Sequence, residues 1–325
     1  MAVPKTPSVK TRFLIISDTH GNNSNPESDT LESVDVAIHC GDLTEESKIE
    51  EFRTTLQLLK NIIAGLKLVI AGNHDFTMDI PVFMKKVAEV QPPLDLHLVQ
   101  REYGDYGEAR QLFEDAQSNG IMFLDEGNHR FSLSNGASLT VYASPFTPSP
   151  SCGWAFQYHP EQGHDFSIQN GTDIVITHGP PKGIMDFTVS RERAGCSDLF
   201  EAVARARPRL HCFGHIHEGW GAKLVAWRDK ISANPSHFTD IDNSKSVLLG
   251  NIRRLNDSRS RRETLACFSS SHCSGDINPL DPWKHTLFVN AAIQGIDDAS
   301  QMPWLIDMEL PRQTHIWDGP VDQPW

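Results

Sequence analysis

The segment 11–21, TRFLIISDTHG, shows the pattern on which this chain is built: a short apolar run that leads directly into polar residues. Its aliphatic and β-branched side chains predict a buried strand over 11–17. Asp18 and His20 follow the end of that strand, and Gly21 allows the backbone to turn sharply there. Taken alone, an aspartate that caps a turn beside a surface histidine explains the stretch equally well.

The same pattern recurs further along the chain. The apolar runs 34–40, 66–71, 173–177 and 210–213 lead into the sequences GD at 41–42, GNHD at 72–75, H at 178 and GHIH at 214–217. Apolar residues at helical spacing predict amphipathic helices over 48–66 and 195–207. Strands that alternate with helices predict an α/β fold, and in open α/β sheets sites form at the carboxyl ends of the strands.

The polar clusters together supply carboxylate, imidazole and amide groups. Such oxygen and nitrogen donors suit divalent first-row metals such as Mn²⁺, Fe²⁺ or Zn²⁺. There are enough donors for two ions, and a pair of ions is a known arrangement for hydrolysis at phosphorus. Each cluster alone could be a loop, a turn or a buried histidine. Clusters in this order, each after an apolar run, are improbable as independent accidents.

The order D-x-H, G-D, G-N-H-D, H and G-H-x-H resembles that of the calcineurin-like metallophosphoesterase superfamily. Segments such as IHCGDLTE, LVIAGNHD and GTDIVITHGPPKGIMD are similar to its metallophosphoesterase-domain-containing (MPPED-like) branch, over most of residues 11–227 and about 284–310. The resemblance implies a four-layer α/β/β/α sandwich with a two-metal site at the carboxyl ends of the strands. It also implies a hydrolase that cleaves phosphate esters by attack of a metal-bridging hydroxide.

The resemblance also assigns ligands and catalytic groups by position. It implies that the first ion is held by Asp18, His20 and His217, the second by Asn73, His178 and His215, and both by a bridging Asp42. His74 would stabilise charge on the phosphoryl oxygens or protonate the leaving oxygen, and Asp75 would orient His74. Mn²⁺ is the expected ion, with Fe²⁺, Zn²⁺ or Ni²⁺ as alternatives.

Two positions bear on how this chain compares with members of that branch. The closest animal members usually carry glutamate where Asp75 stands, so a shorter side chain would have to reach His74. Some members carry glycine in place of His215, which is linked to weak activity and tight nucleotide binding. This chain keeps the histidine, so we expect a working enzyme with a complete ligand set.

The residues after Gly41-Asp42 bear on the substrate. They are Leu-Thr-Glu-Glu rather than the longer Asp-Arg-Gly signature of protein phosphatases in the superfamily, so a protein substrate is not expected. The branch resemblance favours small phosphodiesters, above all cyclic nucleotides. A nucleotide would need an aromatic surface for its base and a few donors for its phosphate. The candidates are Trp154, Phe156 and Trp220 for the base and Asn22 and Thr44 for the phosphate, with core packing or loop capping as the alternative for each.

Other functions stay open. The same metals would serve a broad phosphomonoesterase or a nuclease, and the chain could also be a weakly active nucleotide-binding or scaffold protein. Its 325 residues include 29 basic and 42 acidic ones, which gives a formal charge of −13. This charge argues against non-specific binding to nucleic acid or to an anionic membrane surface. With no apolar signal region at its start and no stretch of membrane-spanning length, we expect a cytoplasmic protein without a membrane partner. Its oligomeric state is left open.

A single domain is expected over 11–310, with an insertion at 228–283 and tails at 1–10 and 311–325. The insertion is rich in Ser, Asn and Arg and lacks sustained periodicity, which predicts a partly flexible segment with the basic run 253–262 as a solvated loop. A strand is expected over 286–292 and an edge strand over 304–308. His39 and His211 lie inside apolar runs and are expected to be core histidines.

Overall fold

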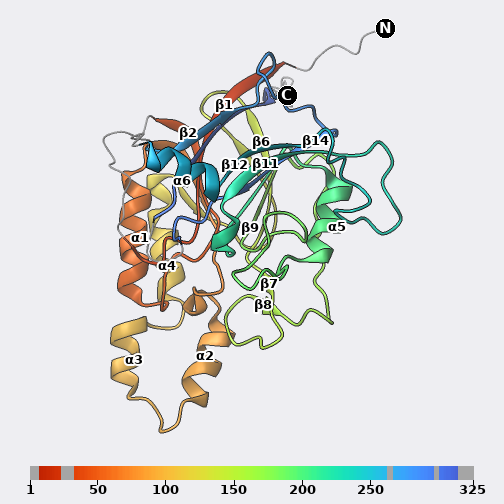
Figure 1. The fold of residues 1–325 in the computed structure, drawn as a ribbon. Coiled ribbons are helices and arrows are strands. Elements are labelled where there is room, and N and C mark those ends of the chain that lie inside the picture. The colour runs from red at the N-terminus through yellow and green to blue at the C-terminus, as the bar shows by residue number, and fades with distance from the viewer. Residues whose placement is uncertain (1–6, 23–32, 262–265, 296–299, 314–325) are drawn as a thin grey trace, which may run out of the picture.

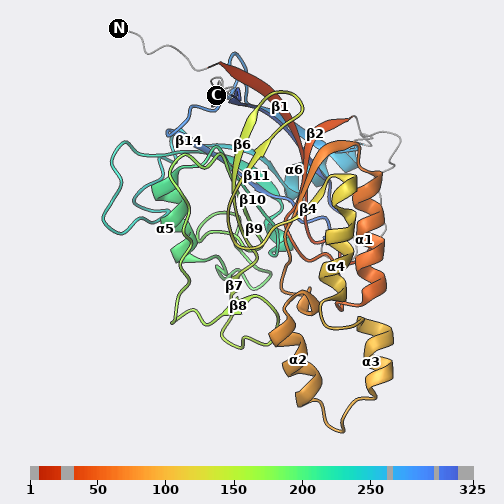
Figure 2. The ribbon, with the colours of Figure 1, turned by 180° about the vertical axis from the view of Figure 1, so that it is seen from behind.

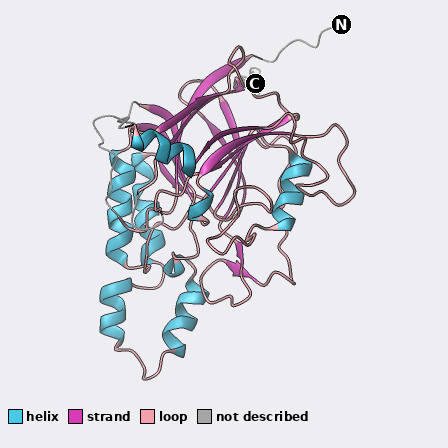
Figure 3. Ribbon diagram, in the orientation of Figure 1, coloured by secondary structure: helices cyan, strands magenta, loops and turns pink. Residues whose placement is uncertain are grey.

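The computed structural model describes residues 7–22, 33–261, 266–295 and 300–313. Two β-sheets lie face to face in these residues, and helices cover their outer sides (Figure 1 and Figure 3). The view from behind shows α1 (Ile49–Asn61) and α4 (Glu108–Asp115) together on one side and α5 (Ser197–Ala206) on the other (Figure 2). The α/β class and the four-layer arrangement are therefore confirmed.

The first sheet combines strands from both ends of the chain. Its order in the described residues is β13 (Phe268–Ser271), β15 (Trp304–Pro311), β1 (Ser8–Ile16), β2 (Val34–His39), β3 (Ala64–Val69) and β4 (Ile121–Phe123). Strands β1 to β4 run parallel, whereas β15 runs antiparallel to β1. The carboxyl ends of β1, β2 and β3 therefore lie side by side at one end of the sheet.

The second sheet has a parallel centre and antiparallel edges. Its order in the described residues is β12 (Val247–Asn251), β11 (Gly221–Ala226), β14 (His285–Asn290), β10 (Leu210–Phe213), β9 (Ile174–Thr177), β6 (Ser138–Ser144) and β5 (Gly127–Ser132). Strands β6, β9, β10 and β14 run parallel. Two short strands, β7 (Thr147–Pro148) and β8 (Gln157–Tyr158), pair separately.

Side chains of the central strands alternate between two apolar layers. Phe13 and Ile15 of β1 point into the core between the sheets, whereas Leu14 belongs to a separate cluster on the other face. In the core between the sheets they pack with residues of the second sheet such as Val141 and Ile176. Burial of each such side chain contributes roughly 1.5–3 kcal/mol. Because both faces of these strands are covered, they read as continuous apolar runs in the sequence.

The outer helices are amphipathic, as their spacing predicts. Helix α1 buries Phe52, Leu56 and Leu59 on the first sheet, and α5 buries Leu199, Phe200 and Val203 on the second. The start of α1 is stabilised by the Glu51 carboxylate, which accepts the backbone N–H of Lys48 at 2.8 Å. The helix is shorter than the predicted 48–66, because residues from Ala64 onward pair with β2 as β3.

The segment 228–283 is more regular than its sequence suggests. It contains β12 at the edge of the second sheet, α6 (Ile252–Ser260), and β13 at the edge of the first sheet. The solvated loop predicted at 253–262 is therefore wrong, because most of these residues are helical. Only Leu255 and Ser258 of α6 are buried, which leaves no apolar periodicity to read from the sequence.

The predicted tail boundaries also differ from the structure. β1 begins at Ser8, inside the predicted N-terminal tail, and β15 extends to Pro311. The strand predicted at 304–308 is confirmed as part of β15, but its predicted position at the edge is wrong, because β13 pairs with the outer side of β15. The tail residues 1–6 and 314–325 lie outside the described residues. None of the described helices has both the length and the apolar character needed to cross a lipid bilayer.

The two histidines predicted to lie in the core, His39 and His211, do so, since both side chains are fully buried. Nε2 of His211 donates to Oγ1 of Thr177 at 2.8 Å, because that hydroxyl donates in turn to the carbonyl of Gly179. Nδ1 of His211 has no hydrogen-bond partner among the described residues. Burial therefore lowers the pKa of His211 to about 3.

We expect His211→Gln to reduce the loss of stability in mild acid. The pKa of His211 in the folded state lies below its ordinary value of 6.5, so only the unfolded chain gains this proton as the pH falls below 6.5. The neutral imidazole makes its full contribution to the free energy of unfolding above about pH 7. This contribution falls by about 2 kcal/mol between pH 6.5 and 5. Urea unfolding of the metal-free protein measures this, with His97→Gln on the exposed side of α3 (Leu96–Tyr103) as the control. Equal pH slopes for the wild type and His211→Gln would contradict the prediction.

Candidate metal centre

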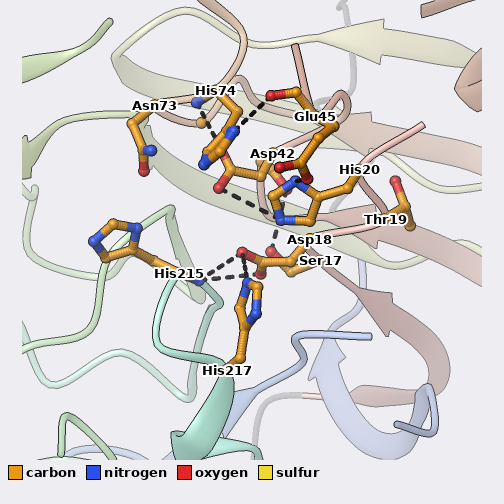
Figure 4. Close-up of polar contacts among 12 residues, drawn as sticks. Ser17, Asp18, Thr19, His20, Asp42, Glu45, Asn73, His74, His215 and His217 are labelled. Atoms are coloured by element: carbon orange, nitrogen blue, oxygen red, sulfur yellow. Dashed lines mark hydrogen bonds and ion pairs between the residues drawn. The ribbon is translucent and has the colours of Figure 1, made fainter. Parts of the chain in front are cut away.

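The carboxyl ends of parallel strands from both sheets bring the predicted ligands together (Figure 4). Asp18 and His20 follow β1, Asp42 follows β2, Asn73 follows β3, His178 follows β9, and His215 and His217 follow β10. Two groups have ligand atoms within 4.8 Å of one another, and their members are Asp18, His20 and His217, and Asp42, His178 and His215. Each group draws on both sheets. The core between the sheets therefore determines their spacing.

The first group is organised around the buried carboxylate of Asp18. Both of its oxygens accept the backbone N–H of His215 at 3.0 Å, and Nε2 of His217 lies 3.2 Å from Oδ1. The His20 ring lies edge-on to the His217 ring, with 5.4 Å between their centroids. Three side chains from two sheets thus point toward one another.

The second group is organised around His178. Its Nδ1 donates to the carbonyl of Cys40 at 2.9 Å, which leaves Nε2 facing the centre. Nε2 lies 3.1 Å from Oδ2 of Asp42 and 3.0 Å from Oδ1 of Asn73. The His215 ring lies 5.0 Å from the His178 ring between centroids. The Asn73 side chain therefore lies beside the second group, at the position that the resemblance implies.

Asp42 belongs to the second group and also lies close to His20 of the first. Its Oδ2 is 3.1 Å from Nε2 of His178 in one group and 4.0 Å from Nε2 of His20 in the other. Its Oδ1 accepts the backbone N–H of His74 at 2.8 Å, which holds the carboxylate in this orientation. A carboxylate in this position can serve two ions at once.

The donor set fits divalent metal ions. Both ring nitrogens of His20 are buried and lack a hydrogen-bond partner among the described residues. The Glu45 carboxylate lies 2.8 Å from Nδ1 of His20 without forming a hydrogen bond to it. Leaving a buried polar group unpaired is costly, and a bound cation would remove that cost. The oxygen and nitrogen donors match those that Mn²⁺, Fe²⁺ or Zn²⁺ prefer.

The charges of the centre also suit cations. Burial opposes the ionisation of Asp18 and Asp42, but the neighbouring histidines outweigh it and lower the pKa of both carboxyls, that of Asp42 to about 2. Burial lowers the pKa of His215 to about 4, so this imidazole is neutral. Burial opposes protonation of His178 as well, but the Asp42 carboxylate raises its pKa to about 9. A metal ion would have to displace that proton, so metal binding would release protons.

Unusual backbone geometry holds the ligands in place. Asp18, His20, Asp42 and His215 have φ angles of 53°, 48°, 51° and 66°, in the left-handed region that side chains other than glycine rarely adopt. Such conformations cost of order 1–3 kcal/mol each and cluster at functional sites. A Cβ at Gly214 would overlap with the Asp18 carboxylate and the Ser17 hydroxyl. The surrounding fold therefore holds these residues in positions they would not adopt by themselves.

His74, the predicted catalytic imidazole, lies at the open side of the centre. Its Nδ1 donates to the carbonyl of Glu45 at 2.7 Å, so Nε2 is left to act on a substrate. Its ring lies 4.8 Å from that of His20 and stacks on Trp154 at 4.6 Å, all between centroids. The half-buried His74 thus stands between the ligands and an exposed aromatic surface.

Asp75 does not orient His74, contrary to the prediction. Its buried carboxylate accepts the backbone N–H groups of Leu43, Thr44 and Gly72 and the Thr44 hydroxyl, at 2.7–3.1 Å. It therefore ties the loop after β2 to the loop after β3. Burial and the nearby Asp42 carboxylate raise the pKa of Asp75 to about 7. Thr44, predicted to contact phosphate, is fully buried in this clamp and does not face a substrate.

The predicted base-stacking residues have different environments. Trp220 is buried in the core, stacks on Trp304 at 5.0 Å between centroids, and donates to the carbonyl of Met302, so its assignment to the substrate is wrong. Phe156 is half-buried and packs against the cluster under α1. Trp154 is 40% exposed beside His74 and remains a candidate. Asn22 is exposed at the end of a described segment, beyond the His20 turn.

Glu45 is a residue of the centre that sequence reasoning missed. Its side chain lies 2.8 Å from Nδ1 of His20, and its backbone carbonyl accepts Nδ1 of His74. His20, Glu45 and His74 also form a third group with clustered ligand atoms. Glu45 lies in the GDLTE stretch that resembles the family, but no ligand spacing distinguishes it there.

We expect Glu45→Gln to weaken Mn²⁺ binding by about tenfold, because it removes a negative charge that lies 2.8 Å from the His20 ring, and loss of such an outer partner costs 10–100-fold in affinity. Competition with a chelator or calorimetric titration of the metal-free protein measures this. The control is Glu50→Gln, an exposed glutamate in the first turn of α1 that pairs with Arg53. Unchanged Mn²⁺ affinity in Glu45→Gln would show that the carboxylate has no role in holding His20.

The sequence matches the calcineurin-like phosphoesterase family over residues 11–219. These residues include every member of the two groups and His74. The chain therefore belongs to this family, which supports metal-dependent hydrolysis of phosphate esters as the chemistry of the centre.

Individual relatives place the chain within the family. It is 34% identical over 242 residues to human metallophosphoesterase domain-containing protein 1, across 71% of this chain and 68% of that protein. It is 32% identical over 219 residues to a UPF0046 protein of Caenorhabditis elegans, across 65% of this chain and 52% of that protein. These similarities support the MPPED-like branch.

A further relative has a name that does not fit this chemistry. A protein of Emericella nidulans named probable rhamnogalacturonate lyase C is 32% identical over 226 residues, across 69% of this chain but only 18% of that protein. Its name therefore says little about the shared segment. Among solved structures, a purple acid phosphatase from yellow lupin seeds is 10% identical with a TM-score of 0.41, across 93% of this chain and 54% of that one. Similarity this low adds nothing to the family match.

Proposed function

We propose that this protein is a metal-dependent phosphodiesterase that acts on small diesters, foremost cyclic nucleotides, with two Mn²⁺ ions as the expected cofactor. The main support is the position of Asp42, whose Oδ2 lies 3.1 Å from His178 and 4.0 Å from His20. Each of the two groups that it connects is complete, including His215. A chain that only bound nucleotides would have no need of this full set.

The residues of the centre have different roles around the phosphoryl group. When bound, the two ions would supply an ionised water and neutralise charge on the phosphoryl oxygens. Asp18, His20 and His217 would hold one ion, Asn73, His178 and His215 the other, and Asp42 both. His74 keeps Nε2 available by donating Nδ1–H to Glu45, so it can protonate the leaving oxygen or stabilise phosphoryl charge.

Two observations support a small substrate. The aromatic residue beside His74 is Trp154, which is 40% exposed and can contact a flat organic group. The residues after Asp42 belong to the Asp75 clamp, since Leu43 and Thr44 both donate to that carboxylate. This loop therefore holds the ligand-bearing segments together, and it lacks the Asp-Arg-Gly signature of the protein phosphatases.

The test is hydrolysis of bis(4-nitrophenyl) phosphate by metal-stripped protein, before and after addition of Mn²⁺. We expect turnover only with metal, and higher kcat/KM for the diester than for 4-nitrophenyl phosphate. The 2′,3′- and 3′,5′-cyclic nucleotides are then compared as substrates. A higher kcat/KM for the monoester would favour a phosphomonoesterase. Absence of turnover with Mn²⁺, Fe²⁺, Zn²⁺ and Ni²⁺ would refute the proposal.

A further inference from the structure

A pocket of about 480 Å³ opens beside the candidate metal centre, between α2 (Ile80–Glu89) and α3. These two helices form a hairpin that projects away from the sheets (Figure 1). The α2–α3 pocket is lined mainly by apolar and aromatic side chains, including Phe76, Phe83, Val87, Val90, Tyr103 and Trp154. Its volume lies in the range of pockets that bind small organic molecules.

Trp154 belongs both to this pocket and to the surroundings of the metal centre. Its ring stacks on His74 at 4.6 Å between centroids, with 28° between the planes. Lys86 of α2 holds it there, since Nζ donates to the carbonyl of Gly153 at 2.8 Å and lies 5.0 Å from the centre of the Trp154 ring. Glu46, the residue after Glu45, also lines the pocket. The pocket therefore borders the surroundings of His74, with Trp154 as the residue common to both.

The walls of the pocket favour an uncharged aromatic group. Phe76, Phe83 and Tyr103 lie at 5.6–6.1 Å from one another between centroids, a spacing in which another ring can join the cluster. Lys86 is already engaged with Gly153 and the Trp154 ring. The other charged side chains of the lining are Glu46 and Glu89, which would repel an anionic group. Val90 and Leu94 are 39% and 41% exposed at its rim, so an occupant would cover apolar surface.

The geometry points to the α2–α3 pocket as the subsite for an uncharged aromatic group carried by the phosphate ester, seated next to Trp154 while the phosphoryl group lies at the metal centre. This inference rests on the proposed function and adds to it the kind of organic group that the enzyme selects. The aromatic group is the ester portion nearest His74. Diesters that carry an aromatic ring are then the preferred class of substrate.

The experiment uses phosphonates, which resist hydrolysis. Methylphosphonate, benzylphosphonate and (2-naphthylmethyl)phosphonate are titrated calorimetrically into Mn²⁺-loaded protein and assayed as inhibitors of bis(4-nitrophenyl) phosphate hydrolysis. We expect benzylphosphonate to bind about tenfold more tightly than methylphosphonate, and the naphthyl compound more tightly still, because each buries additional apolar surface. Equal affinities for all three would overturn the inference. The uninhibited hydrolysis reports separately on the proposed function.

Two variants that fill the pocket, Val87→Trp and Val90→Trp, locate the binding. Each is expected to reduce the affinity for benzylphosphonate to about that for methylphosphonate. The matched control is Met84→Trp, on the same helix but outside the lining and 53% exposed, which should keep the tenfold preference. A preference that persists in both pocket variants would place the aromatic group elsewhere and overturn the inference. If Val87→Trp does not fold, the affinity of Val90→Trp, at the exposed rim, for benzylphosphonate tests the inference.

Discussion

Asp42→Ala is expected to reduce Mn²⁺-dependent hydrolysis of bis(4-nitrophenyl) phosphate by about a thousandfold or more, because metal ions supply several kcal/mol of transition-state stabilisation. Asp42 is the carboxylate that lies within reach of both ligand groups, at 3.1 Å from His178 and 4.0 Å from His20. Its loss also leaves the backbone N–H of His74 without its acceptor. Elemental analysis should show fewer than two metal ions per chain.

The control for this variant is Asp115→Ala at the exposed end of α4, which should keep full activity. Asp42→Asn separates charge from shape, since it keeps an oxygen that can accept from His74 but removes the negative charge. We expect it to be nearly as inactive as the alanine variant. An Asp42→Ala protein that holds two ions and retains wild-type turnover would contradict the bridging role.

Gly72→Ala is expected to lower the same activity by about a hundredfold while the protein stays folded, because a small displacement of catalytic groups has effects of this size. A Cβ at Gly72 would overlap with the backbone nitrogen and Oδ1 of Asp42 and lie 2.8 Å from Cε1 of His178. Neither neighbour can withdraw easily, because His178 is fully buried and Asp42 is held by His74. The methyl group should therefore displace the bridging carboxylate.

The matched control is Gly65→Ala on β3, the strand that leads to Gly72. A Cβ there meets Oγ of Ser134 at 3.4 Å and the carbonyl of Asp35 at 3.7 Å, both ordinary contacts. That variant should keep its activity. Mn²⁺ titration of Gly72→Ala is expected to show weakened binding. Wild-type affinity and turnover in Gly72→Ala would mean that the loops after β2 and β3 can separate without consequence.

Local sequence patterns were sufficient for the central strands and for the residues at their ends. Runs such as 11–17 and 66–71 are apolar on both faces because each strand is covered on both sides, so their position is readable without the structure. The polar residues that follow these runs lie at the carboxyl ends of parallel strands, where the fold brings them together. Local patterns therefore indicated which residues lie near one another, whereas their division into two groups came from the family resemblance.

Residues whose role depends on a distant partner could not be predicted in this way. Asp75 follows His74 in sequence, but its carboxylate accepts hydrogen bonds from Leu43 and Thr44, some thirty residues away. Trp220 stands three positions after His217, yet it packs in the core on Trp304. Neighbours in sequence point in different directions, and only the packing decides which of them meets the substrate.

The sequence by itself determined the α/β class, the strands that carry the centre and the chemical types of its ligands, because strands and their ends follow from local patterns of apolar and polar residues. Only the tertiary structure decided how the two sheets obtain their edge strands, since β12 and β13 are defined by hydrogen bonds to β11 and β15, which lie more than twenty residues away in the chain. It also decided that Asp42 lies between two groups of ligands and that Trp154 joins His74 to the α2–α3 pocket. These arrangements depend on long-range packing, to which no local pattern in the sequence corresponds.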